Sequence, residues 1–223
     1  MFTPKAHIII IDGKKDSGRN TLCFELALAL LYSAQRTAIV ASPDSPLYNA
    51  LKERRKTIPE LLTPAILSRE EFYNEANKYN AVIIPHTDAN DELAVTASTY
   101  ITMLPKEKPE LKQFIKNKNY QANLFELKKK IASAYGHGLN WVVCENNLKT
   151  AQIIEQPSSE LEAFSRLHGF KVAPPLNLRN AYKNNIKGIS AQDKSLPMLK
   201  KLLTYEDICA KREVVRLAEF IFS

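Results

Sequence analysis

The sequence has few cysteines and no long apolar segment. Cys23, Cys144 and Cys209 lie far apart and form no Cys-X-X-Cys pair, so we expect neither a disulfide framework nor a zinc site. This cysteine usage fits a reducing cytoplasm. No apolar run reaches the roughly 18 residues that a membrane-spanning helix needs. The apolar run in the N-terminal segment MFTPKAHIIIID is too short for a signal peptide, and we interpret it as a first strand.

The composition is that of an ordinary globular protein. Hydrophobic residues make up 45% of the 223 residues and charged residues 25%, and we expect one domain over residues 1–223. The net charge of +7 is compatible with a polyanionic partner such as DNA or an acidic membrane surface. The basic residues are scattered, however, and we interpret the densest run, Lys128 to Lys130, as the solvated face of a helix.

Segments with the pattern of strands alternate with segments that have the pattern of helices. Strands are expected at residues 7–11, 37–41, 81–84, 99–103, 139–144 and 171–173. Helices are expected at residues 21–34, 69–79 and 159–168 and from about 204 to the C-terminus. This alternation predicts an α/β fold, a three-layer sandwich with a mostly parallel central sheet.

Short local patterns set the expected ends of these elements. Three pairs have capping-box spacing: Ser68 with Glu71, Ser159 with Glu162, and Thr204 with Asp207. Three prolines are expected to end strands, namely Pro43, Pro46 and Pro85. Gly169 is expected to stop a helix. The apolar faces of the last two helices are expected to consist of Leu161, Phe164 and Leu167, and of Ile208, Val214, Val215, Leu217 and Ile221.

The turn between the first predicted strand and helix has the layout of a phosphate-binding loop. In parallel α/β sheets, ligands bind at the carboxyl ends of strands, where a helix N-terminus attracts phosphate. The turn reads GKKDSGRNT, which lacks the usual GK[ST] but fits the outline of the variant KGGxGK[ST]. Lys14 is then the early lysine and Gly18 the last glycine. Arg19 replaces the second lysine, Asn20 replaces the magnesium-holding hydroxyl, and Thr21 follows.

With this loop the sequence resembles the ParA/MinD group of deviant P-loop ATPases, and within it the MipZ branch. LNWVVCENNL (residues 139–148) is similar to the strand and turn that pack beside the nucleotide base in that branch. LEAFSRLHGFKVAPPLNLRNAYKN (residues 161–184) is similar to its helix, strand and basic segment, and AKREVVRLAEFI (residues 210–221) to its last helix. The similarity has low identity, covers nearly the whole chain and is strongest from Leu139 onward.

The resemblance implies a cofactor and partners. ATP with Mg²⁺ would bridge two subunits of a homodimer, and Lys14 of one subunit would reach the phosphates held by the other. FtsZ and a ParB-type protein are the implied partners, in cell-division placement or chromosome partitioning. The implied nucleotide contacts are Lys14, Gly18, Arg19, Asn20, Thr21 and, at the base, Asn146. The implied DNA-facing residues are Arg179 and Lys183, with Lys187 close by.

Three motifs depart from the family pattern. Lys15 and Asp16 replace two loop glycines, and a carboxylate within a few ångströms of phosphate repels it by about 1 kcal/mol or more. After the second strand, Ala41 stands where the family has aspartate, and Asp44 is displaced. After the third strand, Pro85 stands at another aspartate position. We therefore predict weak nucleotide binding and little or no hydrolysis.

Other interpretations stay open. The loop is also compatible with a plain polar turn, Asn146 with a turn cap, and the basic segment with solvated charge. His86 with Asp88 has the composition of a general-base pair, although such a pair is more often a loop hydrogen bond. Trp141 is expected in the core. Two alternative functions are a non-enzymatic DNA- or protein-binding scaffold and a small P-loop transferase of the dethiobiotin-synthetase type.

Overall fold

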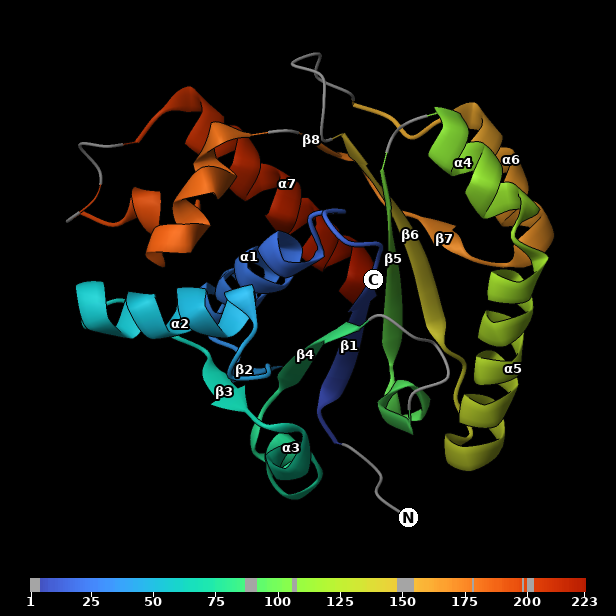
Figure 1. The fold of residues 1–223 in the computed structure, drawn as a ribbon, viewed down its shortest axis with the longest axis horizontal. Helices are drawn as coiled ribbons and strands as arrows, with labels where there is room; N and C mark the ends of the chain where they lie inside the picture. The colour runs from blue at the N-terminus through green and yellow to red at the C-terminus, as the bar shows by residue number, and fades with distance from the viewer. Residues whose placement is uncertain are drawn as a thin grey trace.

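The computed structural model describes residues 5–86, 92–105, 108–147, 155–177, 179–197, 199 and 203–223. Within these residues, parallel strands form one central sheet that carries helices on both faces (Figure 1). The predicted α/β sandwich is therefore confirmed. None of the helices in this part of the chain has the length and hydrophobicity needed to span a bilayer.

The sheet has the strand order β3-β2-β4-β1-β5-β6-β7, and β8 also pairs with β6. The strands are β1 (His7–Asp12), β2 (Thr37–Val40), β3 (Ala65–Leu67), β4 (Ala81–His86), β5 (Thr99–Pro105), β6 (Asn140–Asn147), β7 (Lys171–Val172) and β8 (Leu176–Asn177). Because β1 is central and lies between β4 and β5, the loop that follows it reaches the middle of the carboxyl edge of the sheet.

The helices are of two kinds, α-helices and 3₁₀ helices. The α-helices are α1 (Arg19–Tyr32), α2 (Pro46–Thr57), α3 (Arg69–Glu75), α4 (Lys108–Lys116), α5 (Lys118–Tyr135), α6 (Ser159–His168) and α7 (Tyr205–Phe222). The short 3₁₀ helices are η1 (Ala76–Lys78), η2 (Glu92–Thr96), η3 (Asn180–Lys187) and η4 (Asp193–Ser195).

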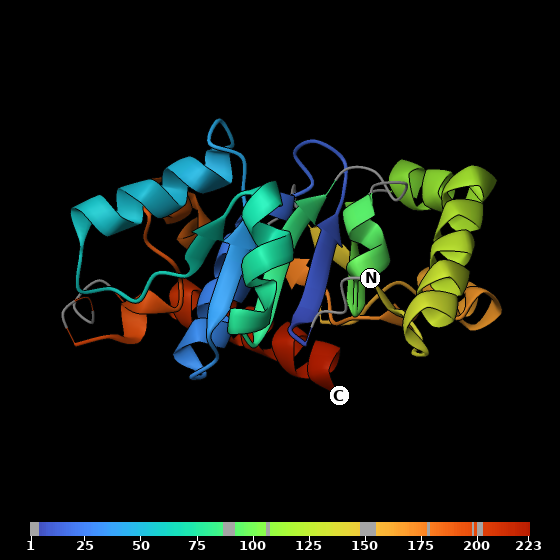
Figure 2. The same ribbon diagram turned by 90° about the horizontal axis from the view of Figure 1, so that it is seen from below.

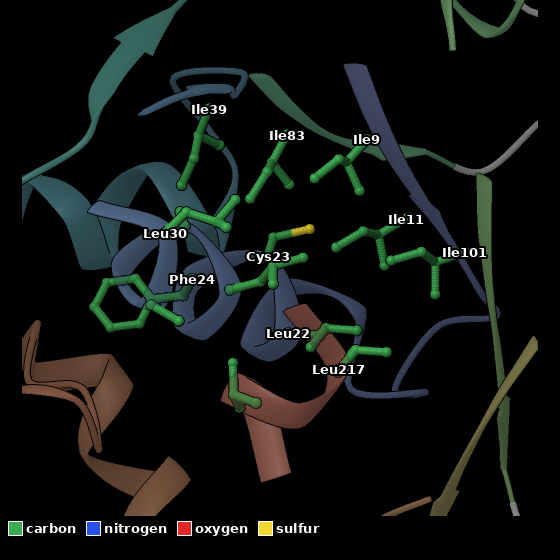
Figure 3. Packing of buried hydrophobic residues seen from close by; sticks show 14 of the residues in the cluster. Ile9, Ile11, Leu22, Cys23, Phe24, Leu30, Ile39, Ile83, Ile101 and Leu217 are labelled. Atoms are coloured by element: carbon green, nitrogen blue, oxygen red, sulfur yellow. The ribbon is translucent and has the colours of Figure 1, made fainter. Parts of the chain in front are cut away.

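The sheet separates two hydrophobic cores, because successive strand residues point to opposite faces. Ile9 and Ile11 of β1 pack with α1, α2 and α7 on one face. Ile8 and Ile10 pack with α3, α4, α5 and α6 on the other. Figure 2 shows the two layers of helices from below. In Figure 3, Cys23 of α1 points toward the isoleucines of the sheet, and it is fully buried.

Several elements were absent from the sequence prediction, among them α4 and β8, and proline explains the absence of another, α2. α2 begins at Pro46, where we expected only the end of a strand. Ser45 caps this helix by accepting a hydrogen bond from Tyr48 N (3.1 Å), and proline suits the first helical position because no N–H is needed there. β3 was missed as well, and its three residues are too few to give a periodic pattern.

Pro85 does not end the third predicted strand, and that prediction is wrong. β4 continues through Pro85 to His86. Its ladder with β2 stops at Ile83, so the last residues of β4 pair with β1 alone and a missing N–H is tolerated. The predicted weaker strand at residues 99–103 is in fact a long, central one, β5.

Of the predicted capping boxes, Ser68 with Glu71 and Thr204 with Asp207 are confirmed. The Ser159–Glu162 box is wrong, because the N-cap of α6 is Ser158 and no side-chain bond caps the helix. Instead, Ser158 donates its hydroxyl and its N–H to the carboxylate of Glu145 at 2.6 and 2.8 Å. Gly169 ends α6 with φ of +64°, as expected for a helix stop.

The predicted apolar faces are only partly buried. Leu161 is buried, but the side chain of Leu167 is 81% exposed, so the predicted stripe of α6 is wrong there. Helix α7 packs through Val214, Leu217 and Ile221, whereas Ile208 and Val215 are only half-buried on its outer side. Trp141 is buried, as expected, and donates Nε1–H to Thr102 Oγ1 at 3.0 Å.

Candidate functional site

The loop between β1 and α1 ends in a helix N-terminus that suits an anion. Gly18 is the N-cap, with φ of +86°, and no side chain occupies the capping position. The first turn of the 14-residue helix α1 contains no acidic residue. Because the first N–H groups of a helix lack intrahelical partners and carry partial positive charge, this end attracts phosphate or carboxylate.

Two loop positions, Asp16 and Gly13, are restricted in conformation or space. Asp16, at the position of a family glycine, has φ of +64°, a conformation that aspartate tolerates better than most residues. A Cβ at Gly13 would lie 2.4 Å from the hydroxyl oxygen of Ser17 and 2.9 Å from Cβ of Met103, so a side chain there would require its neighbours to shift. Ser17 is buried, and within the described part of the chain its hydroxyl has no hydrogen-bond partner.

Asp12, the last residue of β1, fixes the start of the loop. Its Oδ1 accepts the N–H of Gly13 at 2.7 Å. Its Oδ2 accepts the hydroxyls of Tyr100 (3.0 Å) and Tyr120 (2.8 Å). Burial, with the charge of Asp12 nearby, raises the pKa of both tyrosines, so both hydroxyls stay protonated and donate.

Lys14, the early lysine of the motif, is held by α4. Its ammonium lies 2.6 Å from Glu110 Oε2 and 2.6 Å from Gln113 Oε1. The Lys14 side chain is still 58% exposed, so the pair is easily screened by salt. The lysine therefore stands at the surface, as a reach toward a second subunit requires, but it is already partnered within its own chain.

Arg19, at the position of the second lysine, turns back onto the loop. Its Nη1 donates to the carbonyl oxygens of Gly13 (3.1 Å) and His86 (2.7 Å). Its Nε is buried and has no hydrogen-bond partner among the described residues. The guanidinium thus ties the loop to the end of β4. Asp88 lies outside the described residues, so its predicted pairing with His86 stays a prediction.

Asn146 contacts the loop from β6, the strand where the base contact was expected. Its Nδ2 donates to Ser17 O at 2.8 Å, and the residue is buried. A cavity of about 200 Å³ lies beside it, lined also by Gly18, Thr21 and Tyr182. The structure therefore brings Asn146, Gly18 and Thr21 together around one hollow next to the helix N-terminus.

Asn20 faces a different and larger cavity, of about 750 Å³, which lies between α1, α2 and η3. Asp44, the displaced aspartate, lines the same cavity. Nevertheless, the described residues contain no group of three or more His, Cys, Asp or Glu side chains that could hold a metal ion. Asp44 and Glu53 are the described carboxylates that line this cavity, fewer groups than a Mg²⁺ site formed by protein side chains alone would need.

The three predicted DNA-facing residues have unlike surroundings. Arg179 is only 7% exposed, and its guanidinium pairs with Glu213 of α7 (Nη2–Oε1, 2.6 Å; Nε–Oε1, 3.2 Å). We expected it on the surface, and this placement corrects that expectation. Lys183 and Lys187 are exposed on η3, near the exposed Ile186.

Sequence reasoning missed a buried polar cluster below this site. Glu25 of α1 is fully buried and accepts Ser190 Oγ–H (2.6 Å) and Ala191 N–H (3.1 Å). Burial raises its pKa to about 7, and Asp193 adds to this. A carboxylate between Phe24 and Leu26, in an otherwise apolar helix, was the signal that could have revealed this cluster.

Comparison with known proteins identifies the fold. No protein-family model matches the sequence, and no curated protein matches it. Solved structures do match over nearly full length. Apo McdA from Cyanothece has a TM-score of 0.61 at 12% identity, with 97% of this chain and 100% of that chain covered. The septum site-determining protein MinD of Pyrococcus horikoshii, complexed with Mg-ADP, has 0.59 at 14% identity, with 97% and 96% covered.

A third match is a putative plasmid partition protein of Borrelia burgdorferi bound to AMPPNP. Its TM-score is 0.54 at 13% identity, and 98% of each chain is covered. The chain thus has the fold of the ParA/MinD type, as the sequence resemblance implied. At such identities the likeness establishes the fold alone.

Proposed function

We propose that this protein is a ParA/MinD-like positioning or partition protein that binds an adenine nucleotide weakly and hydrolyses it poorly or not at all. The single observation that carries the proposal is the loop after β1. The proposal is supported by the left-handed Asp16 at the position of a family glycine and by Gly18, which caps a helix whose first turn has no acidic residue. The fold agrees, since matching proteins were solved with Mg-ADP and AMPPNP.

Different residues around the loop would bind the phosphates and the base of a nucleotide. The N-terminal N–H groups of α1 would hold phosphate oxygens. The cavity beside Asn146 would take the base, and Thr21 lies at its edge. Lys14, once released from Glu110, would neutralise phosphate charge, including that held by a second subunit of a homodimer.

The same surroundings disfavour hydrolysis. Bound Mg²⁺ would supply charge neutralisation and orientation of the phosphates, and Asp44 and Glu53 are the described carboxylates at the cavity beside Asn20. Asn20, however, replaces the hydroxyl that holds Mg²⁺ in the family motif. Ala41 and Pro85 have no group that could orient water. Arg19 is engaged with two carbonyl oxygens and would have to break both bonds to reach a phosphate. These losses would leave a switch that works by binding rather than by turnover.

Isothermal titration with ATP, in Mg²⁺ and in EDTA, tests nucleotide binding. We expect weak binding that changes little when Mg²⁺ is removed, and an Arg19→Lys variant that binds more tightly because it restores a compact ammonium. Lys129→Ala, on the far end of α5, is the matched control. No heat and no thermal shift at millimolar nucleotide, for both wild type and Arg19→Lys, would reject the proposal.

A separate experiment tests the dimer. In the family motif the early lysine reaches the phosphates of the other subunit, and Lys14→Ala removes the ammonium at that position. Light scattering with ATP should show assembly of the wild type and none of the variant. An unchanged dimer would reject the nucleotide-sandwich arrangement. At a finer level, we propose a role like that of the MipZ branch, with FtsZ or a ParB-type protein as the partner, which pull-down with the purified partners would test.

A second candidate function is a scaffold that binds DNA without nucleotide. It is favoured by the exposed Lys183 and Lys187 on η3 and by the net charge of +7. DNA binding that is unchanged by ATP and by Arg19→Lys would favour this scaffold over the switch.

A further inference from the structure

A third cavity lies beside the loop, on the side of α4 and α5. It encloses about 420 Å³ between the loop, the end of β5 and the helices α4 and α5. Met103, Leu104 and Phe114 give it an apolar wall. Small-molecule sites are mostly apolar hollows of about 300–1,000 Å³ with a few well-placed polar groups, and this cavity falls in that class.

The mouth of the cavity is cationic. Lys14 and Lys15 both line it. Lys15 is exposed, and no residue in the described ranges forms an ion pair with it. Glu110 also lines the cavity, but its charge is offset by Lys14.

Among the described lining residues, the carboxylate other than Glu110 is that of Asp12, which lies at the buried end of the cavity. Asp12 accepts hydrogen bonds from one backbone N–H and two tyrosine hydroxyls. Both carboxylates thus have partners inside the protein, and Lys15 is the exposed charge at the mouth, in front of an apolar wall. That combination fits a ligand with one flat apolar part and one anionic group.

We propose that this cavity is a binding site for a small aromatic carboxylate or sulfonate. The ring would lie against Met103 and Phe114, and the anionic group would pair with Lys15 and with Lys14. Lys14 would exchange its carboxylate partner, Glu110, for the ligand. An exposed ion pair contributes little to stability, so this exchange is easy. Occupation of the cavity would thereby change the position of the lysine at the phosphate-binding loop.

The test uses 2-naphthoate as the probe and the nucleotide-free protein, so it does not depend on nucleotide binding. Titration followed by ¹H–¹⁵N NMR should shift the amide signals of Gly13, Lys15 and Asn117. Lys15→Ala should weaken binding about two- to fivefold, the range that loss of one exposed ion pair gives. Glu110→Gln should strengthen it by a similar factor, because the competing carboxylate is gone. Lys129→Ala is the matched control on α5 and should leave the affinity unchanged.

Naphthalene-2-methanol, with the same ring system and no charge, separates the apolar contribution from the anionic one. We expect it to bind more weakly than 2-naphthoate to the wild type and equally well to Lys15→Ala and the wild type. The proposal is overturned if the three amide signals do not move at millimolar 2-naphthoate. It is also overturned if the neutral compound binds as tightly as the anion, or if Lys15→Ala and Lys129→Ala bind 2-naphthoate alike.

Discussion

Arg54 of α2 and Asp193 of η4 form a two-bond ion pair that is closed off from solvent. Arg54 Nη1 lies 2.5 Å from Asp193 Oδ2 and Nη2 lies 2.7 Å from Oδ1, and neither side chain is exposed. Asp193 also accepts the Tyr32 hydroxyl at 2.6 Å and the Ser190 N–H at 2.7 Å. These bonds attach the segment after η3 to the helices α1 and α2.

Removing one member of this pair should destabilise the protein strongly. Arg54→Met leaves the Asp193 charge buried and unpaired, and we expect a loss of about 3–5 kcal/mol in the free energy of unfolding. Lys129→Met, which breaks the exposed pair with Glu126, should lose less than about 1 kcal/mol. Urea denaturation measures both. Equal losses for the two variants would contradict a structural role for Arg54.

Gly188 should not tolerate a side chain, because of its positive φ and because it lies against the backbone of Arg54. Gly188 and Gly136 have nearly the same positive φ, +72° and +70°. A Cβ at Gly188 would lie 2.5 Å from the backbone of Arg54, whereas one at Gly136 would meet nothing within 4 Å. Gly136→Ala should therefore lose only the backbone penalty, about 1–2 kcal/mol, and Gly188→Ala distinctly more. Thermal or urea unfolding of the two variants measures these losses. Equal losses for Gly188→Ala and Gly136→Ala would contradict the prediction.

Glu25 should make the protein less stable as the pH rises through neutrality. Its pKa is raised from 4.5 to about 7 in the folded state, so the folded protein holds this proton more tightly than the unfolded chain. The resulting stability is complete below about pH 4.5 and is lost as the pH rises through about 7. Between pH 5 and pH 8, the wild type should lose stability on the order of 3 kcal/mol relative to Glu25→Gln.

Urea midpoints at intervals across this pH range provide the measurement. The exposed Glu126→Gln serves as the control and should keep the wild-type slope. Parallel pH profiles for wild type and Glu25→Gln would show that Glu25 stays ionised when buried.

The basic segment should separate into a surface part and a structural part. Lys183→Ala with Lys187→Ala should weaken binding to unrelated DNA sequences and reduce the slope of log affinity against log salt by up to about 2. Arg179→Ala should mainly lower stability, because it leaves Glu213 without its partner. Fluorescence anisotropy at several salt concentrations measures the DNA effect. An unchanged slope in the double lysine variant would remove η3 as a DNA surface.

Local patterns account for the elements that the sequence predicts well. β1 and β6 contain short apolar runs and α1 a longer one, and Thr204 with Asp207 marks the start of α7. The failures come from contacts that a local pattern does not contain. Pro85 is tolerated only because the neighbouring strand β2 has already ended, and the partner of Ser158 is Glu145 on another strand.

The same limit applies to the candidate site. The outline of the loop is visible in the order of Lys14, Gly18 and Arg19. Several of its hydrogen bonds, however, join residues far apart in the chain, such as Arg19 with His86 (67 positions) and Asn146 with Ser17 (129 positions). Likewise, the charge of Arg179 is apparent from the sequence, but its burial against Glu213 depends on how η3 meets α7.

The hydrogen bonds that hold the loop have a consequence for the thermodynamics of ligand recognition. Asp12, Lys14, Arg19 and Asn146 join it to α5, α4, β4 and β6 without any bound molecule. A ligand would thus meet a pre-organised site and lose little conformational entropy in ordering it. The opposing contribution is enthalpic, because bonds of Lys14 or Arg19 must break first. Mutations that loosen these two side chains should therefore move the balance of binding enthalpy and entropy more than they move the affinity itself.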